Sequence, residues 1–282
     1  MFTEENKNLL LEALSYIKRF NEKIVVIKYG GAAMIDESLK HSFAQDIVLL
    51  QSLGMLPVIV HGGGPEVSKA MERLGQEVSF IDGLRVTSSE NLKVAEMVLS
   101  GRINKEIITH LNTFGGKAVG VSGKDGLLIE ARKKQHSGGV DLGYVGEIES
   151  VNPELLLVLL KQCFLPVVSP IGLGKDGVTY NINADTTASR IAVALEAYKI
   201  IFMTDVDGVL EDGKLKGQLS SVEAEKLIKK NVISGGMAPK VSAGVFCVEN
   251  GVASAQIING TDPHSVIAEL FTDKGIGTQI VL

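Results

Sequence analysis

Two short apolar segments that run directly into glycines constrain the fold of this chain more than any other feature. The β-branched run 24–27 is followed at residues 28–31 by Lys-Tyr-Gly-Gly, and the run 56–60 is followed at residues 61–64 by His-Gly-Gly-Gly. A helix is expected after each glycine segment. Because this unit of strand, glycine loop and helix occurs twice in succession, we predict a parallel sheet with crossover helices.

The alternation of strands and helices continues to the end of the chain. Further strands are expected over 118–121, 165–169, 200–204 and 255–258, and helices over 4–20, 38–53, 66–74, 89–99, 102–113, 153–162, 184–195, 221–229, 239–250 and 263–271. The stretch 127–151 has a glycine-rich tip and predicts a β-hairpin at the sheet edge or over a cleft. We therefore predict an α/β fold with an open, mainly parallel sheet sandwiched between helices, in which two lobes share one central sheet.

The boundary between the lobes is expected near residue 178. The segment 172–177 matches the dinucleotide-binding pattern G-x-G-x-x-G, but an extended segment follows it where that pattern needs a helix. We therefore interpret this segment as a turn between lobes. The expected units are an N-terminal oligomerisation helix (1–20), an N-terminal lobe for substrate binding and dimerisation (21–178) and a C-terminal lobe for the nucleotide (179–282).

The composition excludes several classes of protein. A formal net charge of −5 argues against nucleic-acid binding through bulk positive charge. The two cysteines and five histidines have no metal-ligand spacing, so we expect no metal site made by side chains. No apolar run approaches the roughly 18 residues of a membrane span, and the first residues are acidic rather than basic as in a signal segment. We expect a soluble, cytoplasmic protein that binds neither nucleic acid nor membrane.

The His-Gly-Gly-Gly segment at 61–64 has three interpretations. It could supply the oxyanion-hole amides of an esterase, but that class also needs a G-x-S-x-G elbow, and the nearest candidate, 120–124, ends in lysine. It could be only a tight turn, although three successive glycines exceed what a turn needs. It could instead be a phosphate-binding loop, whose backbone N–H groups and following helix attract an anion. We favour the phosphate-binding loop.

Lys28 is expected to lie beside this loop. The carboxyl ends of parallel strands meet at one sheet edge, where open α/β sheets bind ligands, so Lys28, Gly31, Gly62 and Gly63 would surround one crevice. A lysine that ends a buried strand needs an anion to neutralise it. One cation and several backbone amides suit a phosphoryl group in transfer.

Two later segments offer further polar groups. Residues 181–185, Asn-Ile-Asn-Ala-Asp, place two amides and a carboxylate at a helix start, where N-capping is an equally good explanation. In residues 235–240, Gly-Gly-Met-Ala-Pro-Lys, Lys240 falls in a first helical turn, where the helix dipole disfavours a cation. We interpret Lys240 as a ligand for an anion.

Six segments resemble, in order, the amino-acid kinase family and within it the acetylglutamate kinases. They are 26–31, 60–64, 83–87, 181–185, 204–209 and 235–240, and the likeness runs through essentially the whole chain. The resemblance implies that ATP phosphorylates the side-chain carboxylate of N-acetyl-L-glutamate, the second step of arginine biosynthesis. It also implies that Lys28 and Lys240 flank the transferring group, that Asp185 holds both lysines, and that Gly31 and Gly63 donate N–H groups.

The same resemblance implies the binding residues. Arg85 and Asn181 would bind the α-carboxylate of the substrate, in a pocket also lined by Gly62 and Gly63. Mg²⁺ would be held mainly by the nucleotide phosphates and waters. The residues expected around ATP are Asp205, Val206, Asp207, Gly208, Val209, Leu210, Val232, Ile233 and Ser234.

The N-terminal helix resembles the extension of arginine-inhibited members, which join three dimers into a hexamer through such helices. It could also pack on its own subunit. The resemblance implies that L-arginine inhibits the protein. It also implies a homo-oligomer, which is at least a dimer and, by the likeness of this helix, a hexamer. Whether a PII-type sensor binds does not follow from the sequence. The implied effector residues are Tyr16, Arg19, Gln256, Glu269 and Gly275, with Gln256 in a position where arginine-sensitive relatives tend to have histidine.

Two alternatives remain open from the sequence. The acceptor could be glutamate, aspartate, carbamate or a nucleoside monophosphate, as in other amino-acid kinases. The chain could also be a catalytically silent regulator that binds nucleotide, although the intact Lys28, Lys240 and Asp185 argue against this.

Overall fold

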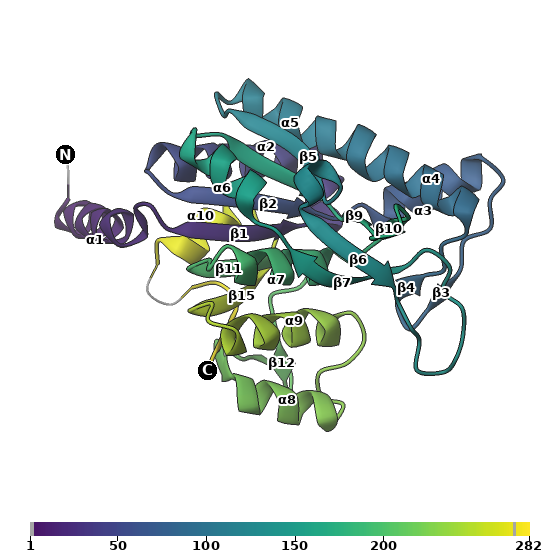
Figure 1. Cartoon of the computed structure of the whole chain (residues 1–282). Coiled ribbons are helices and arrows are strands. Elements are labelled where there is room, and N and C mark those ends of the chain that lie inside the picture. Colours follow the sequence, from purple (N-terminus) through teal and green to yellow (C-terminus); the bar gives the residue numbers. More distant parts are fainter. Residues whose placement is uncertain (1–2, 273–274) are drawn as a thin grey trace.

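The computed structural model describes residues 3–272 and 275–282, and within the first helix it describes only the backbone of residues 5, 6, 8–10, 12, 13 and 17. An eight-stranded sheet forms the centre of the molecule (Figure 1). Only β16 runs antiparallel to its neighbour β15, which confirms the predicted open, mainly parallel sheet. The strand order is β14 (Gln218–Ser220), β16 (Thr278–Val281), β15 (Ser254–Asn259), β11 (Lys199–Thr204), β1 (Ile24–Tyr29), β2 (Leu56–His61), β8 (Leu165–Ser169) and β5 (Ala118–Ser122).

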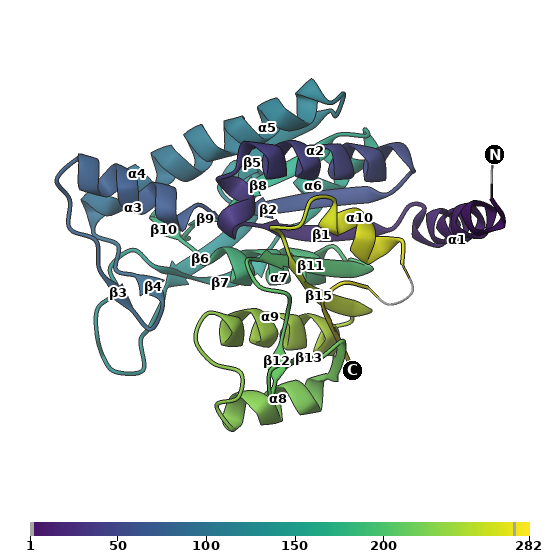
Figure 2. The ribbon, with the colours of Figure 1, turned by 180° about the vertical axis from the view of Figure 1, so that it is seen from behind.

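Helices cover both faces of this sheet (Figures 1 and 2). One face packs against α2 (Glu37–Ser52), α3 (Gly64–Arg73), α4 (Ser89–Glu96), α5 (Asn104–Thr113) and α10 (Ser265–Leu270). The other face packs against α6 (Glu154–Lys161), α7 (Ala184–Ala194), α8 (Ser221–Lys229) and α9 (Met237–Glu249). Burial on both faces explains why the central strands are continuous apolar runs rather than alternating ones.

The strand ends meet as predicted. In the parallel pairing of β1 with β2, Lys28 lies opposite Val60 and Tyr29 lies opposite His61. The Gly62 N–H also donates a hydrogen bond to the Tyr29 carbonyl at 2.8 Å. The two glycine loops therefore leave the sheet side by side, and the first continues into the short 3-10 helix η1 (Gly31–Met34).

The helices expected over 89–99 and 102–113 differ from the prediction, because they form one continuous run. A π-helical stretch, η2 (Met97–Ile103), joins α4 to α5 without a break. Gly101 lies inside this stretch with helical neighbours on both sides. A single glycine lowers helix stability but does not end a helix that packs along its whole length.

A second, four-stranded sheet lies beside the first, in the order β10 (Thr179–Asn181), β9 (Ile171–Leu173), β6 (Ile129–Lys133) and β7 (Gly146–Val151). The pair β6 and β7 is the hairpin expected in 127–151. The segment 172–177 begins in β9 and closes the β9–β10 hairpin. The lobe boundary expected at 178 thus falls inside a hairpin, and the division into lobes stays a prediction.

The remaining elements lie at the periphery. They are α1 (Glu4–Phe20), η3 (Asp125–Leu127) and the two-stranded pairs β3 (Phe80–Ile81) with β4 (Leu84–Arg85) and β12 (Leu210–Glu211) with β13 (Lys214–Leu215). Helix α1 extends away from the sheet at the end opposite β3 and β4 (Figure 1). No helix in the described part of the chain has both the length and the apolar character needed to span a bilayer.

Candidate active site

A cavity of about 270 Å³, which we call the glycine-loop cavity, lies at the carboxyl ends of β1 and β2. It brings together residues that are far apart in the sequence, from both glycine loops, the β3–β4 hairpin and the start of α7. The expected residues that line it are Lys28, Gly31, Gly62, Gly63, Arg85, Asn181 and Asp185. The predicted crevice therefore exists.

Two lysines meet on one buried aspartate beside this cavity. Lys28 Nζ lies 3.1 Å from Asp185 Oδ1, and Lys240 Nζ donates a hydrogen bond to Asp185 Oδ2 at 3.0 Å. Asp185 stands in the first turn of α7, so its backbone is held by the helix, while the N-cap position belongs to Asn183. The alternative of a capping role thus applies to Asn183 and not to Asp185.

The electrostatics of this trio favour a bound anion. Burial lowers the pKa of Lys28 below its ordinary value, although the Asp185 carboxylate opposes the shift. Burial acts to raise the pKa of Asp185, but the charges of Lys28 and Lys240 outweigh it and hold that pKa below its usual range. Two ammonium groups on one ionised carboxylate leave one positive charge in excess, close to the backbone of the glycine loops.

Two residues outside the predicted set of site residues, His61 and Asn104, support the second glycine loop. The Asn104 amide donates to Val167 O at 3.0 Å and lies 3.2 Å from His61 Nε2, so Nε2 accepts and Nδ1 carries the proton. Nδ1 then donates to the Gly62 carbonyl at 2.8 Å. Burial lowers the pKa of His61 to about 4, which keeps the ring neutral.

This hydrogen-bond chain fixes the direction of a backbone donor. The C=O and N–H of one trans peptide point in opposite directions, so holding the Gly62 carbonyl toward His61 turns the Gly63 N–H the other way. In the part of the chain that is described, the Gly63 N–H makes no hydrogen bond. The sequence signal was the histidine before the glycines, but its partner on α5 is 43 residues away.

Arg85 is a buried cation whose described partners are all neutral. Its Nη2 donates to Gly64 O at 2.7 Å and to Ser68 Oγ at 2.8 Å, and its guanidinium lies 4.7 Å from the centre of the Phe80 ring. Among the described side chains no carboxylate pairs with it. A buried arginine without an acidic partner indicates a site for an anionic ligand.

The expected nucleotide residues lie outside this cavity. Asp205–Val209 follow the carboxyl end of β11, where Asp207 Oδ1 accepts from Asn259 Nδ2 and the Val209 N–H donates to Thr278 Oγ1, each at 2.8 Å. Val232–Ser234 form the loop between α8 and α9, three residues before the helix that carries Lys240. None of the nine residues that were expected around ATP lines the glycine-loop cavity.

All five expected effector residues line a separate cavity of about 260 Å³, between α1 and the β15–β16 edge: Tyr16, Arg19, Gln256, Glu269 and Gly275. Glu269 is buried, accepts from the Ile276 N–H at 3.0 Å and lies 3.5 Å from Lys199 Nζ. Arg19 Nε donates to Tyr198 Oη at 3.1 Å. Lys199 and Tyr198 also line this cavity, and the sequence did not indicate them.

The described side chains offer one trio of metal-ligand type, Glu37, His41 and His110, and it lies on α2 and α5 outside the glycine-loop cavity. Within that cavity the carboxylate of Asp185 is already engaged by two lysines. The residues present therefore fit a metal ion that arrives on nucleotide phosphates and do not form a carboxylate cage of their own.

Comparisons with known sequences agree on one protein family. A model of the amino acid kinase family matches residues 23–259. Acetylglutamate kinases are similar over nearly the full length: that of Desulforamulus reducens is 50% identical over 281 residues, covering 98% of both chains. That of Methanocaldococcus jannaschii is 50% identical over 288 residues, covering 98% of this chain and 96% of its own.

Solved structures show the same fold. An N-acetylglutamate synthase from Neisseria gonorrhoeae, complexed with coenzyme A and N-acetyl-glutamate, superimposes with a TM-score of 0.88 at 28% identity, covering 98% of this chain and 63% of that one. The same enzyme complexed with coenzyme A and L-arginine gives a TM-score of 0.84. A carbamate kinase from Giardia, at 16% identity and a TM-score of 0.70, covers 92% of this chain and 99% of its own and shares the fold alone.

Proposed function

The chain belongs to the amino acid kinase family, and we propose that it uses ATP to phosphorylate the side-chain carboxylate of N-acetyl-L-glutamate, the second step of arginine biosynthesis. The acetylglutamate kinases that are about 50% identical along the whole chain support this substrate over carbamate, whose kinase is only 16% identical. The observation that carries the proposal is the pairing of Lys28 and Lys240 on Asp185 beside two glycine loops. This arrangement suits charge that spreads over a phosphoryl group.

In this reaction an oxygen of the substrate carboxylate attacks the γ-phosphorus of ATP, and the bond from that phosphorus to the bridging oxygen of ADP breaks. Lys28 and Lys240 stabilise the charge on the phosphoryl oxygens and on the leaving ADP. The N–H groups of Gly31 and Gly63 donate to the same oxygens. Asp185 positions both ammonium groups, and no protein nucleophile takes part.

The nucleotide is proposed to lie over the C-terminal segment, at Asp205–Leu210 and Val232–Ser234. Val209 and Ile233, one from each loop, belong to the same buried apolar cluster as Val241 of α9, the helix that carries Lys240 toward Asp185. Mg²⁺ would be held mainly by the nucleotide phosphates and water, because the Asp185 carboxylate is already paired with two lysines. The metal would neutralise part of the negative charge of the phosphates, and the two lysines would stabilise the rest of that charge.

Arg85 and Asn181 are proposed to hold the α-carboxylate of the substrate. We expect Arg85→Ala to raise the KM for N-acetylglutamate about 10–100-fold with a much smaller effect on kcat, since a hydrogen-bonded charge contributes roughly 1.5–3 kcal/mol. Ser68→Ala is the matched control, because it removes a partner of Arg85 and keeps the charge. A KM that stays at the wild-type value in Arg85→Ala would place the substrate carboxylate elsewhere.

We propose L-arginine as a feedback inhibitor that binds the cavity lined by Tyr16, Arg19, Gln256, Glu269 and Gly275. The buried Glu269 carboxylate suits a guanidinium, and Gln256 can hydrogen-bond but carries no charge. Helix α1 contributes Tyr16 and Arg19 to this cavity. Leu11 and Leu14 of the same helix are exposed to solvent. Exposed apolar residues on this helix support a role in joining dimers into a hexamer.

Millimolar L-arginine is expected to inhibit the wild-type enzyme. In Glu269→Gln the concentration for half inhibition should rise at least tenfold, because the carboxylate that would pair with the guanidinium is lost. Glu225→Gln, an exposed change on α8, is the control and should leave inhibition unchanged. Full wild-type activity in millimolar arginine would contradict the proposal.

A further inference from the structure

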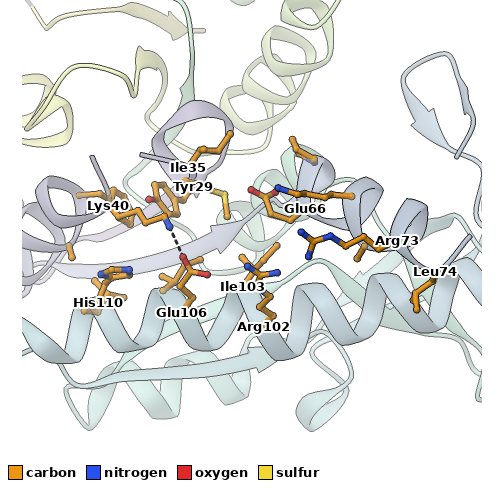
Figure 3. Close-up of a pocket in the computed structure, with 18 residues that line it drawn as sticks. Tyr29, Ile35, Lys40, Glu66, Arg73, Leu74, Arg102, Ile103, Glu106 and His110 are labelled. Atoms are coloured by element: carbon orange, nitrogen blue, oxygen red, sulfur yellow. Dashed lines mark hydrogen bonds and ion pairs between the residues drawn. The ribbon is translucent and has the colours of Figure 1, made fainter. Parts of the chain in front are cut away.

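A third cavity, of about 570 Å³, lies between α2, α3 and the helical run η2–α5 and takes no part in the function proposed above (Figure 3). Its floor is apolar and buried, with Tyr29 and Phe43 stacked at 3.8 Å between ring centres and Ile107 and Leu111 beside them. This volume is typical of pockets that bury a small organic molecule.

Large apolar side chains are exposed at the rim of this cavity. Ile35, just after η1, and Leu74, just after α3, are each 62% exposed and both line it. Exposed apolar residues that adjoin a concave apolar floor mark a surface suited to a ligand with an apolar body.

The rim also carries unpaired positive charge. Lys40 is neutralised by Glu106 at 2.6 Å, but in the described structure Lys69, Arg73 and Arg102 have no ion pair. Among the described residues, Glu66 is the one other acid on the rim. Figure 3 shows Arg73 on the α3 wall and Arg102 on the opposite wall, both beside the space between the helices. In a chain of net charge −5, this excess of cations is local.

We propose that this cavity binds an organic anion with an apolar body. The aromatic or aliphatic body would lie on Tyr29, Phe43 and Ile107, and a carboxylate or sulfonate head would pair with Arg73 and Arg102. Apolar burial and charge-assisted hydrogen bonds then act on opposite ends of one molecule, which gives the site its orientation.

The test uses two dyes with the same apolar body, 8-anilinonaphthalene-1-sulfonate and the uncharged N-phenyl-1-naphthylamine, titrated by fluorescence against the folded enzyme. We expect the sulfonate to bind one site per chain, at least fivefold more tightly than the uncharged dye. The variant Arg73→Ala/Arg102→Ala should weaken sulfonate binding at least fivefold and leave the uncharged dye nearly unchanged. Equal binding of the two dyes to the wild-type enzyme would overturn the anion preference.

A filling variant locates the site. Ala70 lines the cavity from α3, so Ala70→Trp should raise the dissociation constant of the sulfonate at least tenfold, while Glu72→Trp adds the same bulk on an exposed part of α3 and should not. Kinase activity reports that both variants fold. Wild-type binding by Ala70→Trp would overturn the proposal. Light scattering measures the molecular mass of Ala70→Trp. A mass that differs from that of the wild type would also overturn the proposal, because it would show that the cavity is a contact between copies of the chain.

Discussion

Replacement of Lys28 by alanine is expected to lower kcat by about 10²–10³-fold, with a much smaller change in the KM for N-acetylglutamate. The lysine is buried and neighbours the glycine loops, so in the proposed mechanism its charge acts on the phosphoryl group and not on solvent. The variant is expected to fold, because Lys240 still neutralises the Asp185 carboxylate. Steady-state rates at saturating ATP and acetylglutamate measure the effect.

A matched control for this variant is Lys117→Ala, which removes an exposed lysine before β5. Its kcat should equal that of the wild type. Full turnover by Lys28→Ala would exclude the lysine from transition-state stabilisation and overturn the proposed mechanism.

A methyl group at Gly63 is expected to lower kcat/KM at least 100-fold and the free energy of unfolding by about 1–3 kcal/mol. Gly63 has a φ of +147°, where side chains are strained. Its added Cβ would also collide with Ile103 Cδ1 and lie 2.9 Å from Leu99 Cδ2. The two side-chain ends can move aside, but the strained φ remains, so we expect the loop to shift and the Gly63 N–H to move with it. Kinetics together with urea unfolding separate the two effects.

Gly101→Ala is the control for this substitution. Gly101 is helical, and a Cβ there meets nothing within 4 Å, so activity should persist and stability should stay the same or rise by up to about 1 kcal/mol. If Gly63→Ala keeps wild-type kinetics, its amide has no part in the reaction.

The strand ends could be predicted because their signals are local. Lys28 and the two glycine segments each follow an apolar run directly, and parallel pairing then brings them to one edge. Asp185 and Lys240 could be placed near them only through the resemblance to a family. No local pattern reports that α7 and α9 lie side by side, although this is what lets Lys240 reach Asp185.

Contacts between distant segments account for what the sequence missed. The link from Asn104 to His61 depends on how α5 packs over β2, and Lys199 pairs with Glu269 across 70 residues. The β9–β10 hairpin was interpreted as a turn between lobes, because its strands are too short to show alternation. The continuous run from α4 to α5 was split at Gly101, since glycine weighs heavily in a local prediction and packing outweighs it.

We expect this enzyme to transfer a phosphoryl group to the side-chain carboxylate of an acetylated glutamate. Hydroxylamine trapping of the acyl phosphate, with ATP and Mg²⁺ and with N-acetyl-L-glutamate, glutamate, aspartate or carbamate in turn, tests it most directly. We predict that kcat/KM for N-acetyl-L-glutamate exceeds that for each other acceptor at least 100-fold. An equal or higher value for glutamate or any other acceptor, or no ATP-dependent product on N-acetyl-L-glutamate, would contradict this claim.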